Sequence, residues 1–224
     1  MSQQRIKDVR EAENFLQFFH KPGLGYTNCV LEYNKESTVK GYKDSSTVLS
    51  YESPGFIANM LAGLITDMEN AKILDLCAGT GYVGEALHKR GFRNLDAHDG
   101  AQAMVDHCKK TGVYQNFFKC FVGDGNTLPM KDNTYDGIGC SGATVENHLP
   151  SSAQIEIARV IKHGGFFVNS YRANLYETEV EYATEWRELA EKLEKEGTWM
   201  LYGRFFFRKY NKMSQGQMDV YQKL

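Results

Sequence analysis

A glycine-rich turn between an apolar segment and a helix is the feature that most constrains this chain. The turn lies in residues 73–84, which read ILDLCAGTGYVG. The apolar residues before it predict a buried strand, and glycine lets the backbone approach a ligand closely because it has no Cβ. The free N–H groups at the start of the following helix favour a polar or anionic ligand. The segment therefore predicts a nucleotide-like cofactor site in an open α/β sheet.

Two classes of cofactor compete for this loop. Gly79, Gly81 and Gly84 match the GxGxxG spacing of dinucleotide-binding loops, which would make the chain a nucleotide-dependent oxidoreductase. Asp75, four positions before Gly79, favours the second class. A carboxylate repels the pyrophosphate of a dinucleotide, whereas S-adenosylmethionine has no phosphate and carries an α-amino group and a sulfonium cation. Asp75 thus indicates S-adenosylmethionine.

Acidic residues follow two further predicted strands. Asp99 follows the predicted strand 94–98 and lies close to the spacing, about 20 residues after the glycines, at which an acid binds ribose hydroxyls. Asp124 follows the predicted strand 117–122, in a Gly-Asp-Gly turn. Both are also ordinary turn residues, so their type alone leaves the structural interpretation open.

Taken together, these residues resemble the motifs of class I S-adenosylmethionine-dependent methyltransferases. The string DxxxGxG from Asp75 resembles motif I, with Cys77 where many members have a first glycine. Residues 128–136 and 161–167 resemble the phrases before the fourth and fifth strands of the family, and residues 33–44 resemble the segment that precedes motif I in many small-molecule methyltransferases. Residues 99–104 and 174–199 resemble the Williams–Beuren syndrome critical-region methyltransferase-like proteins.

The resemblance implies S-adenosylmethionine as the cofactor and S-adenosylhomocysteine as its product. It implies that Asp124 accepts a hydrogen bond from the adenine amino group. The residues expected at the cofactor are Tyr33, Tyr42, Asp75, Cys77, Ala78, Gly79, Thr80, Gly81, Asp99, Gly100, Met104, Asp124, Gly125, Asn126, Cys140 and Ser141.

The order of predicted elements gives the fold class, α/β. Strands are predicted at 94–98, 117–122, 135–140 and 166–170 besides the one before the glycine turn, and helices at 4–20, 53–67, 83–89, 102–110 and 176–196. Ser151 begins another helix, with Ile155, Ala158 and Ile161 on one face. Segments 199–207 and 217–221 predict a closing hairpin.

We therefore expect a doubly wound, mostly parallel seven-stranded sheet with an antiparallel C-terminal hairpin strand. Residues 1–224 read as one domain: a cofactor-binding core at 53–224 and an N-terminal helical lid at 1–52, of which residues 24–52 look loop-rich.

The methyl acceptor is expected to meet the segment after the fourth strand. His148 is the best candidate general base because its unperturbed pKa lies near neutrality, and Glu146 is a weaker candidate. His148 can equally be a surface or capping histidine. Arg172 either binds an acidic substrate or is solvated. We expect methyl transfer to an O, N or S nucleophile of a small molecule by in-line displacement. A protein or peptide methyltransferase, a quinone C-methyltransferase and a cofactor-binding module without catalysis are the alternatives.

Composition limits the partners. The net charge of −2 lacks the basic excess of a nucleic-acid-binding protein, and Cys140-Ser141-Gly142-Ala143 replaces the (Asn/Asp)-Pro-Pro-(Tyr/Phe) motif of amine methyltransferases of nucleic acids. No apolar stretch is long enough for a membrane span, the N-terminus lacks the apolar core of a signal peptide, and no metal-ligand cluster is seen. Five cysteines without CxxC spacing suggest reduced thiols in a cytoplasmic protein. The oligomeric state is not predicted.

Overall fold

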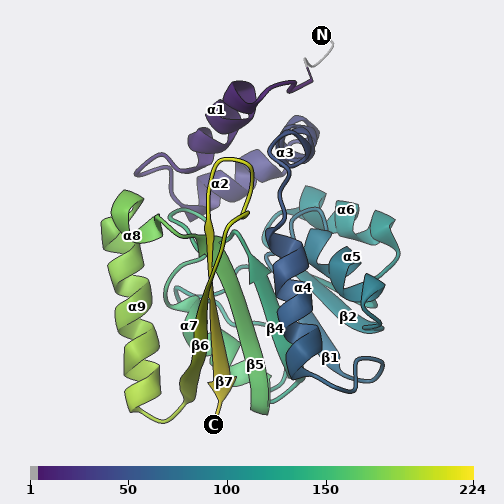
Figure 1. Cartoon of the computed structure of the whole chain (residues 1–224), viewed down its shortest axis with the longest axis vertical. Helices are drawn as coiled ribbons and strands as arrows, with labels where there is room; N and C mark the ends of the chain where they lie inside the picture. The colour runs from purple at the N-terminus through teal and green to yellow at the C-terminus, as the bar shows by residue number, and fades with distance from the viewer. Residues whose placement is uncertain (1–4) are drawn as a thin grey trace.

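One mixed sheet runs through the molecule (Figure 1). The structure is a computed structural model, and it describes residues 5–224. Its strands are β1 (Lys72–Leu76), β2 (Asn94–Asp99), β3 (Asn116–Lys119), β4 (Tyr135–Ser141), β5 (Ile161–Arg172), β6 (Trp199–Phe207) and β7 (Gly216–Lys223). Their spatial order is β3-β2-β1-β4-β5-β7-β6; β1 to β5 pair in parallel, and β7 is antiparallel to both of its neighbours. The predicted fold class is confirmed.

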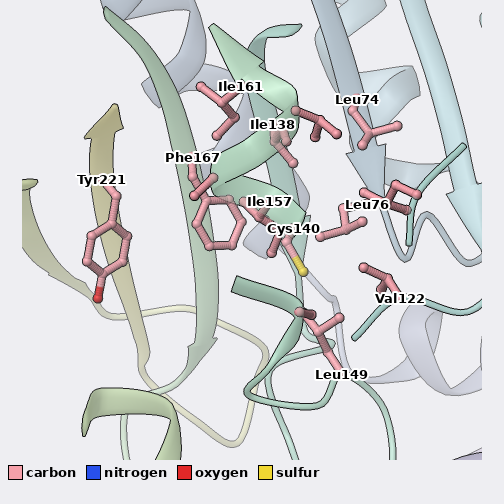
Figure 2. Packing of buried hydrophobic residues seen from close by; sticks show 14 of the residues in the cluster. Leu74, Leu76, Val122, Ile138, Cys140, Leu149, Ile157, Ile161, Phe167 and Tyr221 are labelled. Carbon is pink, nitrogen blue, oxygen red and sulfur yellow. The ribbon is translucent and has the colours of Figure 1, made fainter. Parts of the chain in front are cut away.

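Helices cover both faces of the sheet because successive side chains of a strand point to opposite faces. Ile73 packs with α4 (Ser53–Leu64) and α5 (Tyr82–Lys89), and α6 (Gln102–Thr111) adds Cys108 to the same apolar cluster. Leu74 and Leu76 face the other way, into a cluster with Ile157 of α7 (Ala153–Val160) and with α9 (Val180–Lys195) (Figure 2). Within residues 5–224, no helix is both long enough and apolar enough to cross a membrane.

The N-terminal segment lies over the carboxyl ends of the parallel strands as three helices (Figure 1). These are α1 (Val9–Phe19), α2 (Tyr26–Tyr33) and α3 (Glu36–Val48), which we call the lid. The prediction of a loop-rich segment at 24–52 was wrong. The composition of α3 is rich in serine, threonine and glycine, so its helical propensity is low. Packing overrides propensity here: a Cβ at Gly41 would lie 2.5 Å from the Phe15 ring of α1, so glycine permits the close contact.

Several element boundaries differ from the predictions. The helix that follows Ser151 ends at Val160, and Ile161 begins β5, while Ile155 is 53% exposed and does not belong to the buried face. Periodicity alone leaves the apolar run around Ile161 ambiguous between helix and strand. The pairing of Ile161 with Tyr135 of β4 places this residue in the strand. The predicted strand 117–122 pairs only at 116–119.

The helices at the two ends of the chain also differ. The predicted helix 176–196 is split into α8 (Leu175–Thr178) and α9, and Glu179 between them is not helical. The first helix begins at Val9, where Asp8 caps it by accepting a hydrogen bond from the Glu11 N–H. Residue 4, where that helix was expected to begin, lies outside the described residues.

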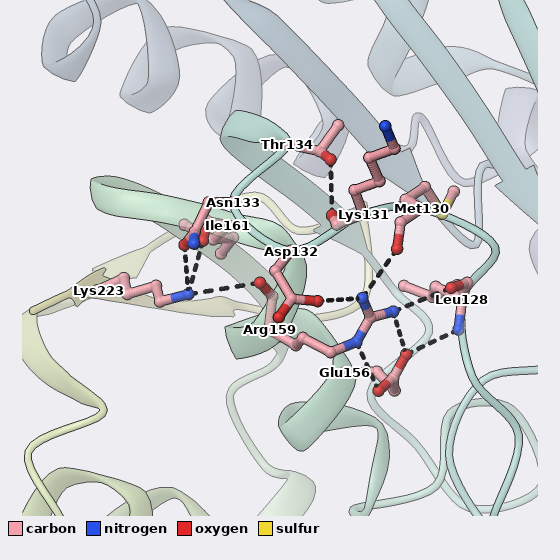
Figure 3. A network of polar contacts seen from close by, with 10 residues as sticks. All are labelled: Leu128, Met130, Lys131, Asp132, Asn133, Thr134, Glu156, Arg159, Ile161 and Lys223. Carbon is pink, nitrogen blue, oxygen red and sulfur yellow. Dashed lines mark hydrogen bonds and ion pairs between the residues drawn. The ribbon is translucent and has the colours of Figure 1, made fainter.

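A network of polar contacts gives residues 128–134, which lead into β4, a structural role. The Arg159 guanidinium of α7 binds the Glu156 and Asp132 carboxylates and the carbonyl oxygens of Met130 and Leu128 (Figure 3). The Arg159 cation lowers the pKa of Glu156. These contacts fix the connection into β4, whose carboxyl end belongs to the site described below.

Candidate active site

A cavity of about 440 Å³ lies beneath the lid, at the carboxyl ends of the parallel strands. The sheet contributes Cys77 after β1, Asp99 of β2, Ser141 of β4 and Arg172 of β5. The strand order reverses between β1 and β4, which is where open α/β sheets bind ligands. The lid closes the cavity with Glu13, Leu16, Gln17, His20, Tyr26, Cys29, Val30, Tyr33, Tyr42, Ser46 and Leu49.

The glycine turn adopts the strained conformation that its sequence suggests. Gly79 and Gly81 have positive φ angles of 56° and 94°, and Cys77 has a φ of 54°. A left-handed residue with a Cβ costs roughly 1–2 kcal/mol, so the position at which the family often has glycine is held here under strain. A Cβ added at Gly79 would meet only Tyr42 of the lid, at 3.9 Å. The turn therefore leaves its backbone open on the side of the lid.

Asp75 lies beneath the turn and does not line the cavity. Its Oδ2 accepts hydrogen bonds from the Gly84 N–H (3.0 Å) and the Tyr114 hydroxyl (2.6 Å), and its side chain is buried. Burial raises the pKa of Asp75 to about 7. The expected contact with the cofactor's cations is not the contact that the structure shows. Strand alternation is the reason: Asp75 points to the same face as Ile73, towards α5.

Asp99 lines the cavity, as the ribose-binding position requires. Its two carboxylate oxygens accept hydrogen bonds from the Gly79 and Ala101 N–H groups, each at 2.9 Å. Burial raises the pKa of Asp99 to about 6, so the group is ionised at neutral pH. Each oxygen keeps a further lone pair for a ligand hydroxyl.

The turn at 124–126 lies outside the cavity lining. The Asp124 N–H donates to the Ser152 hydroxyl oxygen (2.8 Å), and that hydroxyl donates to the Asp124 carboxylate (2.6 Å). Asp124 is exposed and bound to the start of α7, so its expected adenine contact stays a prediction. Gly125 and Asn126 are also exposed, and their expected contacts with the cofactor likewise stay predictions.

The other expected cofactor residues divide between the lining and the layer behind it. Tyr33, Tyr42, Gly100, Met104 and Ser141 line the cavity beside Cys77 and Asp99. The remaining five do not line the cavity: Ala78, Gly79, Thr80, Gly81 and Cys140.

His148 lies in the cavity with a defined tautomer. Its Nδ1 is 3.0 Å from the carbonyl oxygen of Glu146, which can only accept, so Nδ1 carries the proton. Nε2 is then an acceptor, 3.0 Å from the Tyr33 hydroxyl of the lid. Burial, with a smaller effect of His20, lowers the pKa of His148 to about 4. The imidazole is neutral at physiological pH and presents a basic nitrogen to the cavity.

Glu146 is not placed as a base. Its side chain does not line the cavity, and its backbone N–H donates to the Glu179 carboxylate at 2.6 Å. The backbone of Glu146 therefore orients His148 and binds Glu179, and the expectation of a catalytic carboxylate at this position is not met.

Contacts between the lid and the sheet were missed in the sequence. The side chain of Asn147 accepts from the Gly25 N–H and donates to the carbonyl oxygens of Phe19 and Lys21. The partners are more than 120 residues apart in the chain, so no local pattern reveals them. The one available signal was Asn147 itself, a residue type that tolerates the left-handed backbone (φ 67°) found there.

A second contact joins His20 of the lid to the sheet. Its Nδ1 lies 3.1 Å from a Glu179 carboxylate oxygen, and its ring contacts the Arg172 guanidinium at 3.1 Å. Together with Asn147, this contact holds the lid over the loop after β4.

The structure thus combines a doubly wound sheet, a glycine turn after β1 and an acid at the end of β2. Residues 74–169 match the family of methyltransferase domains. This match agrees with the resemblance seen in the sequence, and a solved S-adenosylmethionine-dependent methyltransferase of Corynebacterium glutamicum shares the fold.

Human methyltransferase-like protein 27 is 29% identical over 159 residues, which are 70% of this chain and 63% of that protein. A demethylmenaquinone methyltransferase of Corynebacterium efficiens is 32% identical over 124 residues, which are 55% of this chain and 51% of that protein. The chain thus spans less than two thirds of the length of these relatives. A solved S-adenosylmethionine-dependent methyltransferase of Leishmania major shares the fold, with a TM-score of 0.61, 16% identity, and coverage of 91% of this chain and 86% of that one.

Proposed function

We propose that this chain transfers a methyl group from S-adenosylmethionine to an O, N or S nucleophile of a small molecule. The observation that carries the proposal is one cavity beneath the lid that both Asp99 and His148 line. Its volume of about 440 Å³ lies in the range of small-molecule sites.

The residues present fit the cofactor. Asp99 would accept hydrogen bonds from the ribose hydroxyls, and the open backbone at Gly79 would let the cofactor pass close to the sheet. Tyr33, Tyr42 and Ser141 would surround its methionine part, where aromatic faces favour a cation. Bound there, S-adenosylmethionine supplies an electrophilic methyl group, and its sulfur keeps the electrons of the broken bond.

His148 would take the proton of the methyl acceptor at Nε2. The Glu146 carbonyl oxygen fixes the ring, and the Tyr33 hydroxyl marks the place that an acceptor hydroxyl would occupy. Because the pKa of His148 is about 4, the nitrogen is unprotonated over the whole physiological range, and it is a weaker base than an unperturbed histidine. The lid would exclude water and hold the acceptor in line with the methyl group, which is the main requirement of the displacement.

The relatives favour one alternative acceptor. Several of them are demethylmenaquinone methyltransferases, so transfer to a quinone carbon is the second candidate. We keep the cytoplasmic location as part of the proposal; it is supported by five free cysteines within the described chain.

The test supplies S-adenosylmethionine with a labelled methyl group to the protein in a cell extract that is then separated into small-molecule and macromolecular fractions. Label in the small-molecule fraction supports the proposal and yields a product whose methylated atom separates O, N or S from quinone carbon. Label only in macromolecules identifies a protein methyltransferase. No label, with S-adenosylhomocysteine still bound, identifies a binding module without catalysis, and binding of NAD(H) instead identifies an oxidoreductase.

A further inference from the structure

Arg172 is a cation at the cavity without a carboxylate partner. It is the last residue of β5, is half-buried and lines the cavity. Within residues 5–224, no Asp or Glu oxygen lies within 4.0 Å of its guanidinium. Two other arginines of the molecule differ in this respect: Arg159 binds Glu156 at 2.7 Å, and Arg204 binds Asp219 at 2.8 Å.

The nearby Glu179 is already engaged by other groups. One carboxylate oxygen accepts from the Glu146 N–H at 2.6 Å, and the other is 3.1 Å from Nδ1 of His20. Both ring nitrogens of His20 lie 3.1 Å from Arg172 Nη2. The contact partner of Arg172 is thus a histidine ring and not a carboxylate. A guanidinium carries five N–H donors in a planar fork, so Arg172 keeps donors for a bidentate ligand.

The position of Arg172 relates it to His148. The His20 ring contacts Arg172 and lies with its centroid 5.7 Å from that of His148. The charge of Arg172 also contributes to the lowered pKa of His148, so the two groups act on the same part of the cavity. Arg172 and His148 thus line the same cavity, and the His20 ring contacts both of them.

We infer that the methyl acceptor is a small carboxylic acid, whose carboxylate binds Arg172 while a separate hydroxyl or amine is presented to His148. This inference rests on the proposed function. A planar, bidentate ion pair is the contact for which a free guanidinium is best suited. The carboxylate is not the atom methylated and stays in the product. The proton of the reacting group goes to Nε2 of His148, the new bond joins that group to the methyl carbon, and the methyl–sulfur bond breaks.

S-adenosylmethionine is a second possible source of a carboxylate. Asp99, expected at its ribose, projects from β2, whereas Arg172 projects from β5, with β1 and β4 between them in the sheet. Arg172 contacts His20, and His20 contacts Glu179. The Glu179 carboxylate in turn binds the backbone of the loop after β4, where the acceptor is expected. We therefore assign Arg172 to the acceptor, and the experiment separates the two sources.

The first experiment measures binding by calorimetry with S-adenosylhomocysteine at saturation. The probes are 4-hydroxybenzoate and the uncharged 4-hydroxybenzamide, with wild type, Arg172→Gln and the control Arg208→Gln, an exposed arginine outside the cavity lining. Wild type and Arg208→Gln should bind the acid at least tenfold more tightly than the amide, and Arg172→Gln should lose that preference while its affinity for S-adenosylhomocysteine changes less than twofold. A loss of S-adenosylhomocysteine affinity in Arg172→Gln instead assigns the residue to the cofactor and overturns the inference.

The second experiment needs no choice of probe. The labelled small-molecule product of the extract assay is passed over an anion-exchange resin at neutral pH and again after mild esterification of its carboxyl groups. Retention that esterification abolishes supports a carboxylate in the product. A labelled product that flows through the resin overturns the inference and leaves the proposed function intact, whereas the absence of any labelled product, or of S-adenosylhomocysteine binding, is a failure of the proposed function.

Discussion

Two aspartates at the ends of neighbouring strands have different roles. Asp75 braces the glycine turn from below through Gly84 and Tyr114, whereas Asp99 holds the same turn through Gly79 and still faces the cavity. Both have raised pKa values because of burial, but only Asp99 lines the cavity. The sequence motif that marks both residues therefore combines a structural acid with a binding acid.

Asp99→Asn should weaken S-adenosylhomocysteine binding. An amide keeps the shape of the side chain but loses the negative charge that strengthens hydrogen bonds from ribose hydroxyls and from the Gly79 N–H. Hydrogen bonds to charged groups contribute roughly 1.5–3 kcal/mol, so we expect a loss of about 10- to 100-fold in affinity by calorimetry. Asp106→Asn, on the exposed side of α6, is the control and should bind normally. Equal affinities of wild type and Asp99→Asn would disprove the assignment of the ribose site.

His148→Gln should lower kcat and leave S-adenosylhomocysteine binding unchanged. Removal of a general base costs roughly 100- to 10,000-fold in rate. Since the pKa of His148 is about 4 in the folded protein, the wild-type rate should not fall between pH 8 and pH 5 on account of this group and should fall as the pH approaches 4. His163→Gln, exposed at the start of β5, is the control. If the two variants have the same kcat, His148 only shapes the cavity.

The site residues that could be predicted from the sequence are those at the carboxyl end of a parallel strand. Asp99, Cys77 and Ser141 each follow or end a parallel strand, and such ends meet at one edge of the sheet. His148 was predicted by its loop, but its partner Tyr33, 115 residues earlier, was expected at the cofactor. Arg172 was noted and left open, because whether a charge is solvated depends on neighbours that no local pattern gives.

At the scale of elements, the lid is bound to the loop after β4 by side chains from both sides. Asn147 holds the turn between α1 and α2, and His20 reaches Glu179 between α8 and α9. His20, Asn147 and Glu179 also line the cavity, so the residues that hold the lid in place are residues of the site.

Asn147→Gly should loosen the lid. Glycine keeps the left-handed backbone of this position without strain, so the variant removes three hydrogen bonds to the lid and little else. Hydrogen exchange followed by mass spectrometry should show amides of residues 9–33 exchanging roughly tenfold faster or more, with β1 and β4 unchanged. Asn133→Gly is the matched control, since Asn133 also has a positive φ but binds Lys223 far from the lid. Normal exchange in the lid of Asn147→Gly would show that other contacts hold it closed.

The elements of the core could be predicted because their periodicity and turn residues agree with their packing. The lid helices could not. A helix such as α3 has few apolar residues and weak propensity, and it forms because Phe15 of α1 packs against its Gly41. This tertiary contact joins segments about 26 residues apart, so a sequence window over α3 alone indicates a loop.

Across the whole molecule, two sets of buried ionisable groups change the stability of the folded state in opposite directions as the pH rises. Asp75 and Asp99 have raised pKa values of about 7 and about 6, and the stability that comes from protonating them is lost as the pH rises through those values. His98 and His148 have pKa values lowered to about 4 by burial, so they remove stability as the pH falls below about 6.5. The two effects overlap between pH 4 and 7, so the pH dependence of the stability of the wild type alone cannot separate them.

Asp75→Asn isolates one side of this balance. The wild-type carboxyl is protonated below its ordinary pKa of 3.8 in both the folded and the unfolded state, and above that value it stays protonated longer when folded, up to about pH 7. The folded wild type therefore loses stability as the pH rises towards 7, and the variant, which does not titrate, has no such loss. In urea unfolding, the free energy that the substitution costs should be smaller at pH 8 than at pH 5. Asp96→Asn is the control for the loss of a buried carboxylate that has a cationic partner: Asp96 is equally buried and lies 3.2 Å from the Lys72 ammonium. A larger cost of Asp75→Asn at pH 8 would mean that the hydrogen bonds from Gly84 and Tyr114 stabilise the ionised carboxylate more than burial disfavours it, and the brace beneath the turn would then be an anion.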